Sequence, residues 1–84
     1  MEMSEGRCKP NKDEFVISDE GIMHRPTEYS FVPFPGNPTH GSIREGMIGK
    51  VLADGRRYSP KDVENLCRRL WAQHLTRNTM RKLL

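Results

Sequence analysis

One stretch near the C-terminus constrains the fold most, because it combines a helix start signal with a helical period. Ser59 and Pro60 are typical of the N-cap and the first helical position, since serine can accept a hydrogen bond from a free amide and proline has no amide to leave unpaired. Residues suited to burial then recur at about 100° per residue: Val63, Leu66, Cys67, Leu70, Trp71, His74 and Leu75. The sequence therefore predicts an amphipathic helix over residues 60–77 that organises the core.

The opposite face of this predicted helix is polar and basic, with Lys61, Asn65, Arg68, Arg69 and Ala72. Charge is distributed unevenly along the chain: residues 44–84 hold ten Lys or Arg against four Asp or Glu, whereas residues 1–43 hold four against seven. The C-terminal part is thus +6 and the N-terminal part −3. Such an asymmetry suggests a polyanionic partner, although a solvated helix face produces the same pattern.

The N-terminal half carries the signals of β-structure. Residues 14–18 are short, β-branched and aromatic, and residues 22–25 can return as the second strand of a hairpin. Residues 28–32 read as a third strand, which Pro33 and Pro35 should end because proline cannot donate to a ladder. We therefore expect an α+β fold, in which an N-terminal β-hairpin or three-stranded antiparallel meander packs against one or two C-terminal helices.

Residues 42–55 satisfy two rival patterns. Ser42 and Glu45 match a capping box, and apolar residues follow at helical spacing, so a helix over residues 43–54 is slightly favoured. Two glycines inside that segment would each cost about 1 kcal/mol in a helix. The rival is a strand over residues 47–53 that turns at Asp54-Gly55, a strong hairpin signal.

The chain length of 84 residues suits one small domain. Residues 1–12 are polar and without periodicity, and we expect a disordered tail there. Residues 13–77 then form the single domain. Residues 78–84 fall out of phase with the apolar stripe and are expected to fray.

The sequence holds no motif of a catalytic site, so an enzyme is not expected, and neither a cofactor nor a small-molecule substrate is evident. The metal-ligand types Cys8, His24, His40, Cys67 and His74 show no paired spacing of a zinc site. We interpret Cys67 and His74 as core residues. No apolar run approaches the length of a membrane span, and two unpatterned cysteines favour a reducing, cytoplasmic setting.

Two functional hypotheses follow, both of them non-catalytic. The first is nucleic-acid binding through a basic face made of Arg56, Arg57, Lys61, Asn65, Arg68, Arg69 and Arg77, types that contact phosphates or base edges. The second is a protein–protein interaction or assembly module, either a homodimer or an accessory subunit. It would use Trp71 and Leu75, because tryptophan is enriched at interface hot spots.

Overall fold

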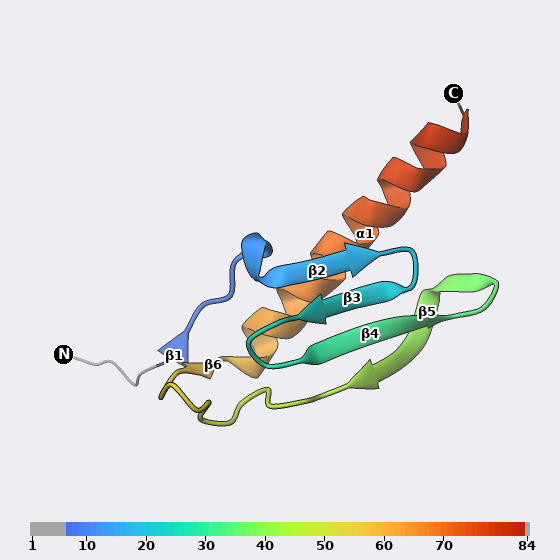
Figure 1. Cartoon of the computed structure of the whole chain (residues 1–84). Coiled ribbons are helices and arrows are strands. Elements are labelled where there is room, and N and C mark those ends of the chain that lie inside the picture. Colours follow the sequence, from blue (N-terminus) through green and yellow to red (C-terminus); the bar gives the residue numbers. More distant parts are fainter. Residues whose placement is uncertain (1–6, 84) are drawn as a thin grey trace.

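The computed structural model describes residues 7–83, with side chains from Cys8 to Met80. Its main element is a four-stranded antiparallel sheet with one long helix, α1 (Pro60–Leu83), lying across one face (Figure 1). The strand order is β2 (Phe15–Ser18), β3 (Gly21–His24), β4 (Tyr29–Phe34) and β5 (Asn37–Arg44). The predicted α+β class is confirmed, with four strands in the sheet rather than two or three.

A second, minimal sheet lies beside the start of α1. It consists of β1 (Arg7–Cys8) and β6 (Arg57–Tyr58), which pair in parallel. A 3-10 turn, η1 (Lys12–Glu14), connects β1 to β2, and a capping box at Asn11 stabilises its start. This pairing joins the described N-terminal segment to the chain just before the helix.

The strand register places a row of apolar residues across the helix-facing side of the main sheet. Ile17 lies opposite Ile22, Ile22 opposite Phe31, and Phe31 opposite Ile43. Directly opposed residues of antiparallel strands point to the same face. The row is covered at Ile22, which is 2% exposed, and uncovered at Ile43, which is 59% exposed.

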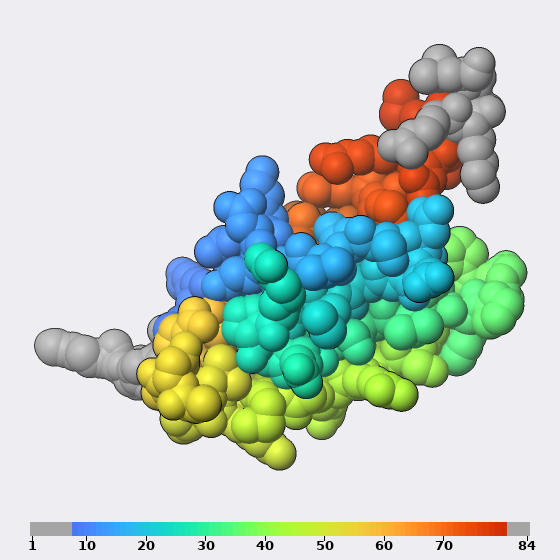
Figure 2. Space-filling model, viewed as in Figure 1, coloured from blue at the N-terminus to red at the C-terminus, as the bar shows by residue number. Residues whose placement is uncertain are grey.

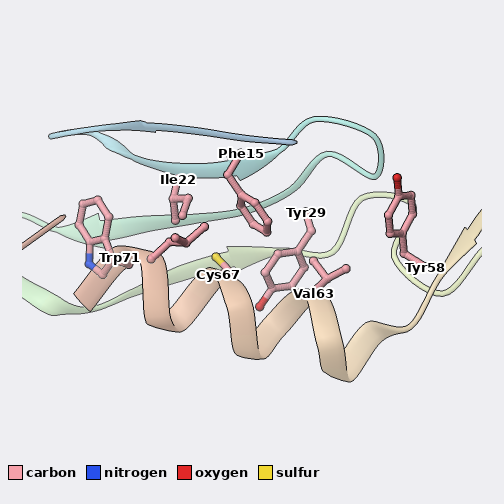
Figure 3. Close-up of a cluster of buried hydrophobic side chains, with 8 residues drawn as sticks. Phe15, Ile22, Tyr29, Tyr58, Val63, Cys67 and Trp71 are labelled. Carbon is pink, nitrogen blue, oxygen red and sulfur yellow. The ribbon is translucent and has the colours of Figure 1, made fainter. Parts of the chain in front are cut away.

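The core lies between the sheet and α1 (Figure 3). The buried hydrophobic residues are Phe15, Ile22, Tyr29, Tyr58, Val63, Cys67, Leu70 and Trp71. The last four recur on α1 at the spacing that the sequence predicts for one helical face. The interpretation of Cys67 as a buried residue is confirmed.

The third strand does not end at the prolines, contrary to the expectation from sequence. β4 continues through Pro33 to Phe34, and a fourth strand, β5, returns along it. The register of β3 on β4 reaches only Phe31, so no β3 residue lies opposite Pro33. Proline is tolerated here because its missing N–H removes no bond from that ladder.

The predicted helix over residues 43–54 is wrong, and so is the rival strand over residues 47–53. Ser42 lies opposite Val32 in the β4–β5 ladder, so strand pairing overrides the capping-box pattern. Gly46 and Gly49 then adopt positive φ values of 57° and 77° in a turn, a conformation that glycine tolerates. The Asp54-Gly55 turn does form, closed by the Leu52 amide, which donates to the Arg56 carbonyl at 2.7 Å.

The structured region extends further at both ends than the sequence suggests. Residues 7–12, expected to be disordered, include β1 and the start of η1, because pairing with β6 supplies partners that the local sequence lacks. Residues 1–6 of that expected tail lie outside the described part. At the other end, α1 continues past Asn78 to Leu83, and Asn78 Nδ2 donates to Asp19 at 2.9 Å. That bond ties the helix to the β2–β3 turn.

The C-terminal part of α1 extends beyond the sheet and stands clear of it in the space-filling view (Figure 2). Among the described residues, no helix has both the length and the apolar content that crossing a membrane would require.

Candidate functional site

Four of the seven residues predicted to bind nucleic acid lie in one exposed row that winds part of the way around α1. Gln73, which was not among the predicted residues, fills the gap in this row. The row then contains every fourth residue of the helix, and all five side chains are exposed: Lys61, Asn65, Arg69, Gln73 and Arg77. Residues four apart are neighbours on a helix surface and form a continuous ridge. We call these five residues the cationic ridge. From first to last it spans about 24 Å, at 1.5 Å per residue.

The second half of the cationic ridge has room for a ligand group. Arg69, Gln73 and Arg77 surround a shallow hollow of about 370 Å³, and the small residues Ala72 and Thr76 line its other side. Thr76 Oγ1 donates back to the Ala72 carbonyl at 3.0 Å, which keeps that hydroxyl close to the helix. The hollow is open to solvent and suits contact with a surface rather than enclosure of a molecule.

The cations of the ridge are not neutralised within the fold. Among the residues whose side chains the structure describes, Cys8 to Met80, the ion pairs join His24 to Glu14, Arg56 to Asp54, and His74 to Asp19. Lys61, Arg69 and Arg77 take part in none of them. Their charges therefore remain available to an external anion.

The other three predicted residues do not join the ridge. Arg56 donates from Nε to Asp54 Oδ2 at 2.7 Å and from Nη1 to the Tyr58 hydroxyl at 2.7 Å, so its guanidinium already has partners. Arg57 is partly buried on β6. Arg68 borders the first half of the ridge, three residues after Asn65, and it also lines a groove between the helix and the sheet. The basic face predicted from sequence is thus divided among three places.

A buried polar network that the sequence did not reveal lies at the start of the sheet. His24 and Thr27 are completely buried, and a hydrogen bond of 2.8 Å joins His24 Nδ1 and Thr27 Oγ1. His24 Nε2 lies 3.0 Å from Glu14 Oε1, and the Tyr58 hydroxyl donates to Glu14 Oε2 at 2.8 Å. The His24 ring packs between Phe15 and Tyr58, with centroid distances of 4.8 and 4.7 Å.

The electrostatics of this network follow from its hydrogen bonds. Burial by itself would raise the pKa of Glu14, but hydrogen bonds from His24 and Tyr58 outweigh that effect, and the pKa lies below its usual value. Burial, together with the hydrogen bond to Glu14, raises the pKa of Tyr58 to about 12. The carboxylate and the neutral phenol therefore stabilise each other at neutral pH.

Thr27, His24 and Glu14 are hydrogen-bonded in the same order as the nucleophile, general base and orienting carboxylate of a catalytic triad. Thr27 is 0% exposed and its hydroxyl also accepts a hydrogen bond from the Tyr29 amide at 3.2 Å, so a substrate has no access to it. The network instead links η1, β3 and β6. No local signal in the sequence could indicate it, because Glu14 and Tyr58 are 44 residues apart.

The residues predicted for a protein interface are largely covered by the chain itself. Trp71 is 6% exposed, and its Nε1 donates to the Pro38 carbonyl at 2.8 Å. Its ring lies 5.7 Å from the Phe31 ring and stacks on His74 at 5.2 Å. Leu75 is partly buried beside it. Trp71 therefore anchors β4 and β5 to the helix within the monomer.

A groove of about 320 Å³ separates α1 from the β4–β5 half of the sheet. Its apolar walls are Tyr29, Phe31, Ile43, Cys67 and Trp71. Burial raises the pKa of Tyr29 to about 12 and that of Cys67 to about 11, so both side chains are neutral at pH 7. The rim is polar and includes His40, Glu64 and Arg68.

The metal-ligand types do not gather in the described region, where no three His, Cys, Asp or Glu side chains are placed to hold an ion. His74, which we expected in the core, is partly buried and lies 3.1 Å from Asp19 Oδ1. Cys8 and Cys67 are both unbonded thiols.

Comparisons with protein-family models, with curated proteins and with solved structures find no match to this chain.

Proposed function

We propose that this protein binds nucleic acid through the cationic ridge of α1. The observation that carries the proposal is the spacing of Lys61, Arg69 and Arg77 along one exposed row, with none of them ion-paired in the described residues. Cations held at regular intervals on a rigid helix match the repeating charge of a phosphate backbone.

The rest of the ridge supports the same proposal. The amides of Asn65 and Gln73 alternate with the cations, and amide side chains can donate to phosphates or to base edges. The major groove of duplex DNA is about 12 Å wide and admits an α-helix. The C-terminal part of α1 extends past the sheet, so a duplex can approach this end of the helix without contacting the strands (Figure 2).

The proposal includes a non-catalytic role and a cytoplasmic location. Both rest on the sequence: it lacks catalytic motifs and its cysteine usage favours a reducing compartment. The alternative of an interface at Trp71 and Leu75 has less support, because Trp71 is already buried against β4 and β5.

The test is fluorescence anisotropy with a labelled mixed-sequence duplex and a labelled single strand, from about 50 to 200 mM salt. The ridge variant Lys61→Ala/Arg69→Ala/Arg77→Ala should bind more weakly and should show a shallower salt slope, by up to about 0.9 for each phosphate that it no longer neutralises. The matched control is Lys9→Ala/Lys12→Ala/Lys50→Ala, which removes the same charge at exposed positions off the helix.

The control variant should retain most of the affinity of the unaltered protein. Absence of binding at low salt, or an equal loss of affinity in both triple variants, would overturn the proposal. The second outcome would mean that only net charge matters and that the ridge has no role of its own.

A further inference from the structure

The two edges of the main sheet are protected very differently. β2 has four residues and is flanked by the acidic side chains of Asp13, Glu14, Asp19 and Glu20. β5 has eight residues; Pro38 near its start has no N–H, and Arg44 at its end is its only Lys, Arg, Asp or Glu. Proteins usually protect an exposed edge by shortening it or by placing charges or proline on it. β2 follows that rule, whereas the middle of β5, residues 39–43, carries neither a Lys, Arg, Asp or Glu nor a proline.

The helix-facing side of β5 also keeps an apolar surface that the chain does not cover. Ile43 lies in the same row as Ile22 and Phe31, yet it is 59% exposed. The reason is the position of α1, which packs mainly on β2 and β3 and contacts the other half at Tyr29, Phe31 and Pro38. The groove between α1 and β5 therefore runs beside an unpaired strand edge.

The chemistry of the groove restricts what can occupy it. One wall is a strand edge, whose outward N–H and C=O groups can be satisfied regularly only by another extended backbone. The floor is uncharged, being formed by Tyr29, Phe31 and Cys67. The charges stand at the rim, where Glu64 and Arg68 are one helical turn apart and oppose each other in sign. The groove is thus complementary to uncharged apolar side chains that project from one side of a strand.

We propose that β5 and α1 form a binding site for an extended peptide segment of a partner protein, which adds to the sheet as a fifth strand. Main-chain hydrogen bonds to β5 supply affinity, and alternate side chains enter the groove over Ile43 and Phe31, as in other cases of strand addition. The partner segment has aliphatic or aromatic residues at every second position on that side. This site goes beyond nucleic-acid binding and lies on a different flank of α1 from the cationic ridge.

The test is a selection from a random-peptide display library against the unaltered chain and two variants in parallel. Ile43→Asp places a charge in the groove at a 59% exposed position, where the fold does not depend on the side chain. Val51→Asp makes the same change at a 60% exposed position in the loop before β6 and is the matched control. Circular dichroism verifies that both variants fold.

Peptides selected on the unaltered chain should show alternating apolar residues, and Ile43→Asp should weaken their binding at least about tenfold, as for loss of an interface hot spot. Val51→Asp and the triple ridge variant should retain binding. Amide exchange should show new protection within residues 37–44 when peptide is bound.

Three results would overturn the proposal. One is failure to enrich any peptide on the unaltered chain beyond the level on Ile43→Asp. Another is binding without new protection in β5. The third is concentration-dependent dimerisation in sedimentation with β5 protected in the absence of peptide, because the added strand would then be a second copy of this chain.

Discussion

The two halves of the main sheet both have apolar residues on the helix-facing side, but the helix buries only one half. Ile22 on β3 and Ile43 on β5 share one row and one face, yet the first is 2% and the second 59% exposed. The difference arises from α1, which crosses the sheet over β2 and β3 (Figure 1). The alternation of side chains along a strand decides which residues face the helix side of the sheet. The position of α1 then decides which of these residues are buried in the core.

The largest effect should come from truncating the isoleucine of the covered half. Ile22→Ala removes buried methyl groups and leaves a cavity, so the free energy of unfolding should fall by about 2–5 kcal/mol. Ile43→Ala is the matched change in the uncovered half and should alter it by no more than about 0.5 kcal/mol. Urea unfolding followed by Trp71 fluorescence measures both values. Equal losses in the two variants would show that the β5 side is covered in solution.

A second comparison tests how closely the strands approach in the uncovered half. A Cβ at Gly41 would lie against the Val32 carbonyl oxygen and 2.7 Å from Pro33 Cα, both of them backbone atoms of β4. Gly41→Ala should therefore force β5 away from β4 and destabilise the protein by about 1–3 kcal/mol.

The control is Gly36→Ala, in the β4–β5 turn, where a Cβ meets nothing within 4 Å but φ is +77°. It should cost about 1–2 kcal/mol through backbone strain and leave the strand pairing intact. Amide exchange of residues 37–44 separates the two cases. Unchanged exchange in Gly41→Ala would contradict the close approach of these strands.

A third comparison concerns two tyrosines with different hydroxyl environments. Tyr58 donates to Glu14 and accepts from Arg56, so Tyr58→Phe leaves both groups without this partner and should cost about 1–3 kcal/mol. The Tyr29 hydroxyl, beside the groove, takes part in no hydrogen bond of the described region, and Tyr29→Phe should cost less. Thermal or urea unfolding decides the order, and the reverse order would refute the assigned network.

The smallest effect is a change in acid sensitivity. The folded pKa of Glu14 lies below the reference value of 4.5, so the unfolded chain takes up this proton first as the pH falls. The stability from Glu14 is present above about pH 4.5 and is lost as the pH drops through the folded pKa. Glu14→Gln should therefore lose less stability on acidification than the unaltered protein. Glu20→Gln, at an exposed position, should follow the unaltered protein. Identical acid profiles for all three would show that Glu14 is not held by His24 and Tyr58.

Part of the candidate site could be predicted from the sequence. Helical periodicity alone places Lys61, Asn65 and Arg69 on the side away from Val63 and Cys67, and all three are exposed in the structure. Arg77 lies only about 40° from Val63 on that wheel, yet it is exposed as well. Arg56 and Arg57 do not belong with them, because partners at Asp54, at Tyr58 and on β1 are not visible in a helical wheel. The groove could not be predicted, since its walls come from two strands and a helix that are distant in sequence.

The elements whose hydrogen bonds and burial pattern are local could be predicted from the sequence. The start of α1 at Pro60 and its buried face follow from the residues within a few positions, and so does the hairpin of β2 and β3. Residues 37–56 depend on tertiary contacts: the local patterns there favour a helix over 43–54 or a strand over 47–53, and pairing with β4 instead makes residues 37–44 a strand and leaves turns after it. The tertiary structure also decided that Ile22 is core and Ile43 is surface. The physical reason is that such choices depend on contacts between segments far apart in the chain, which no local pattern encodes.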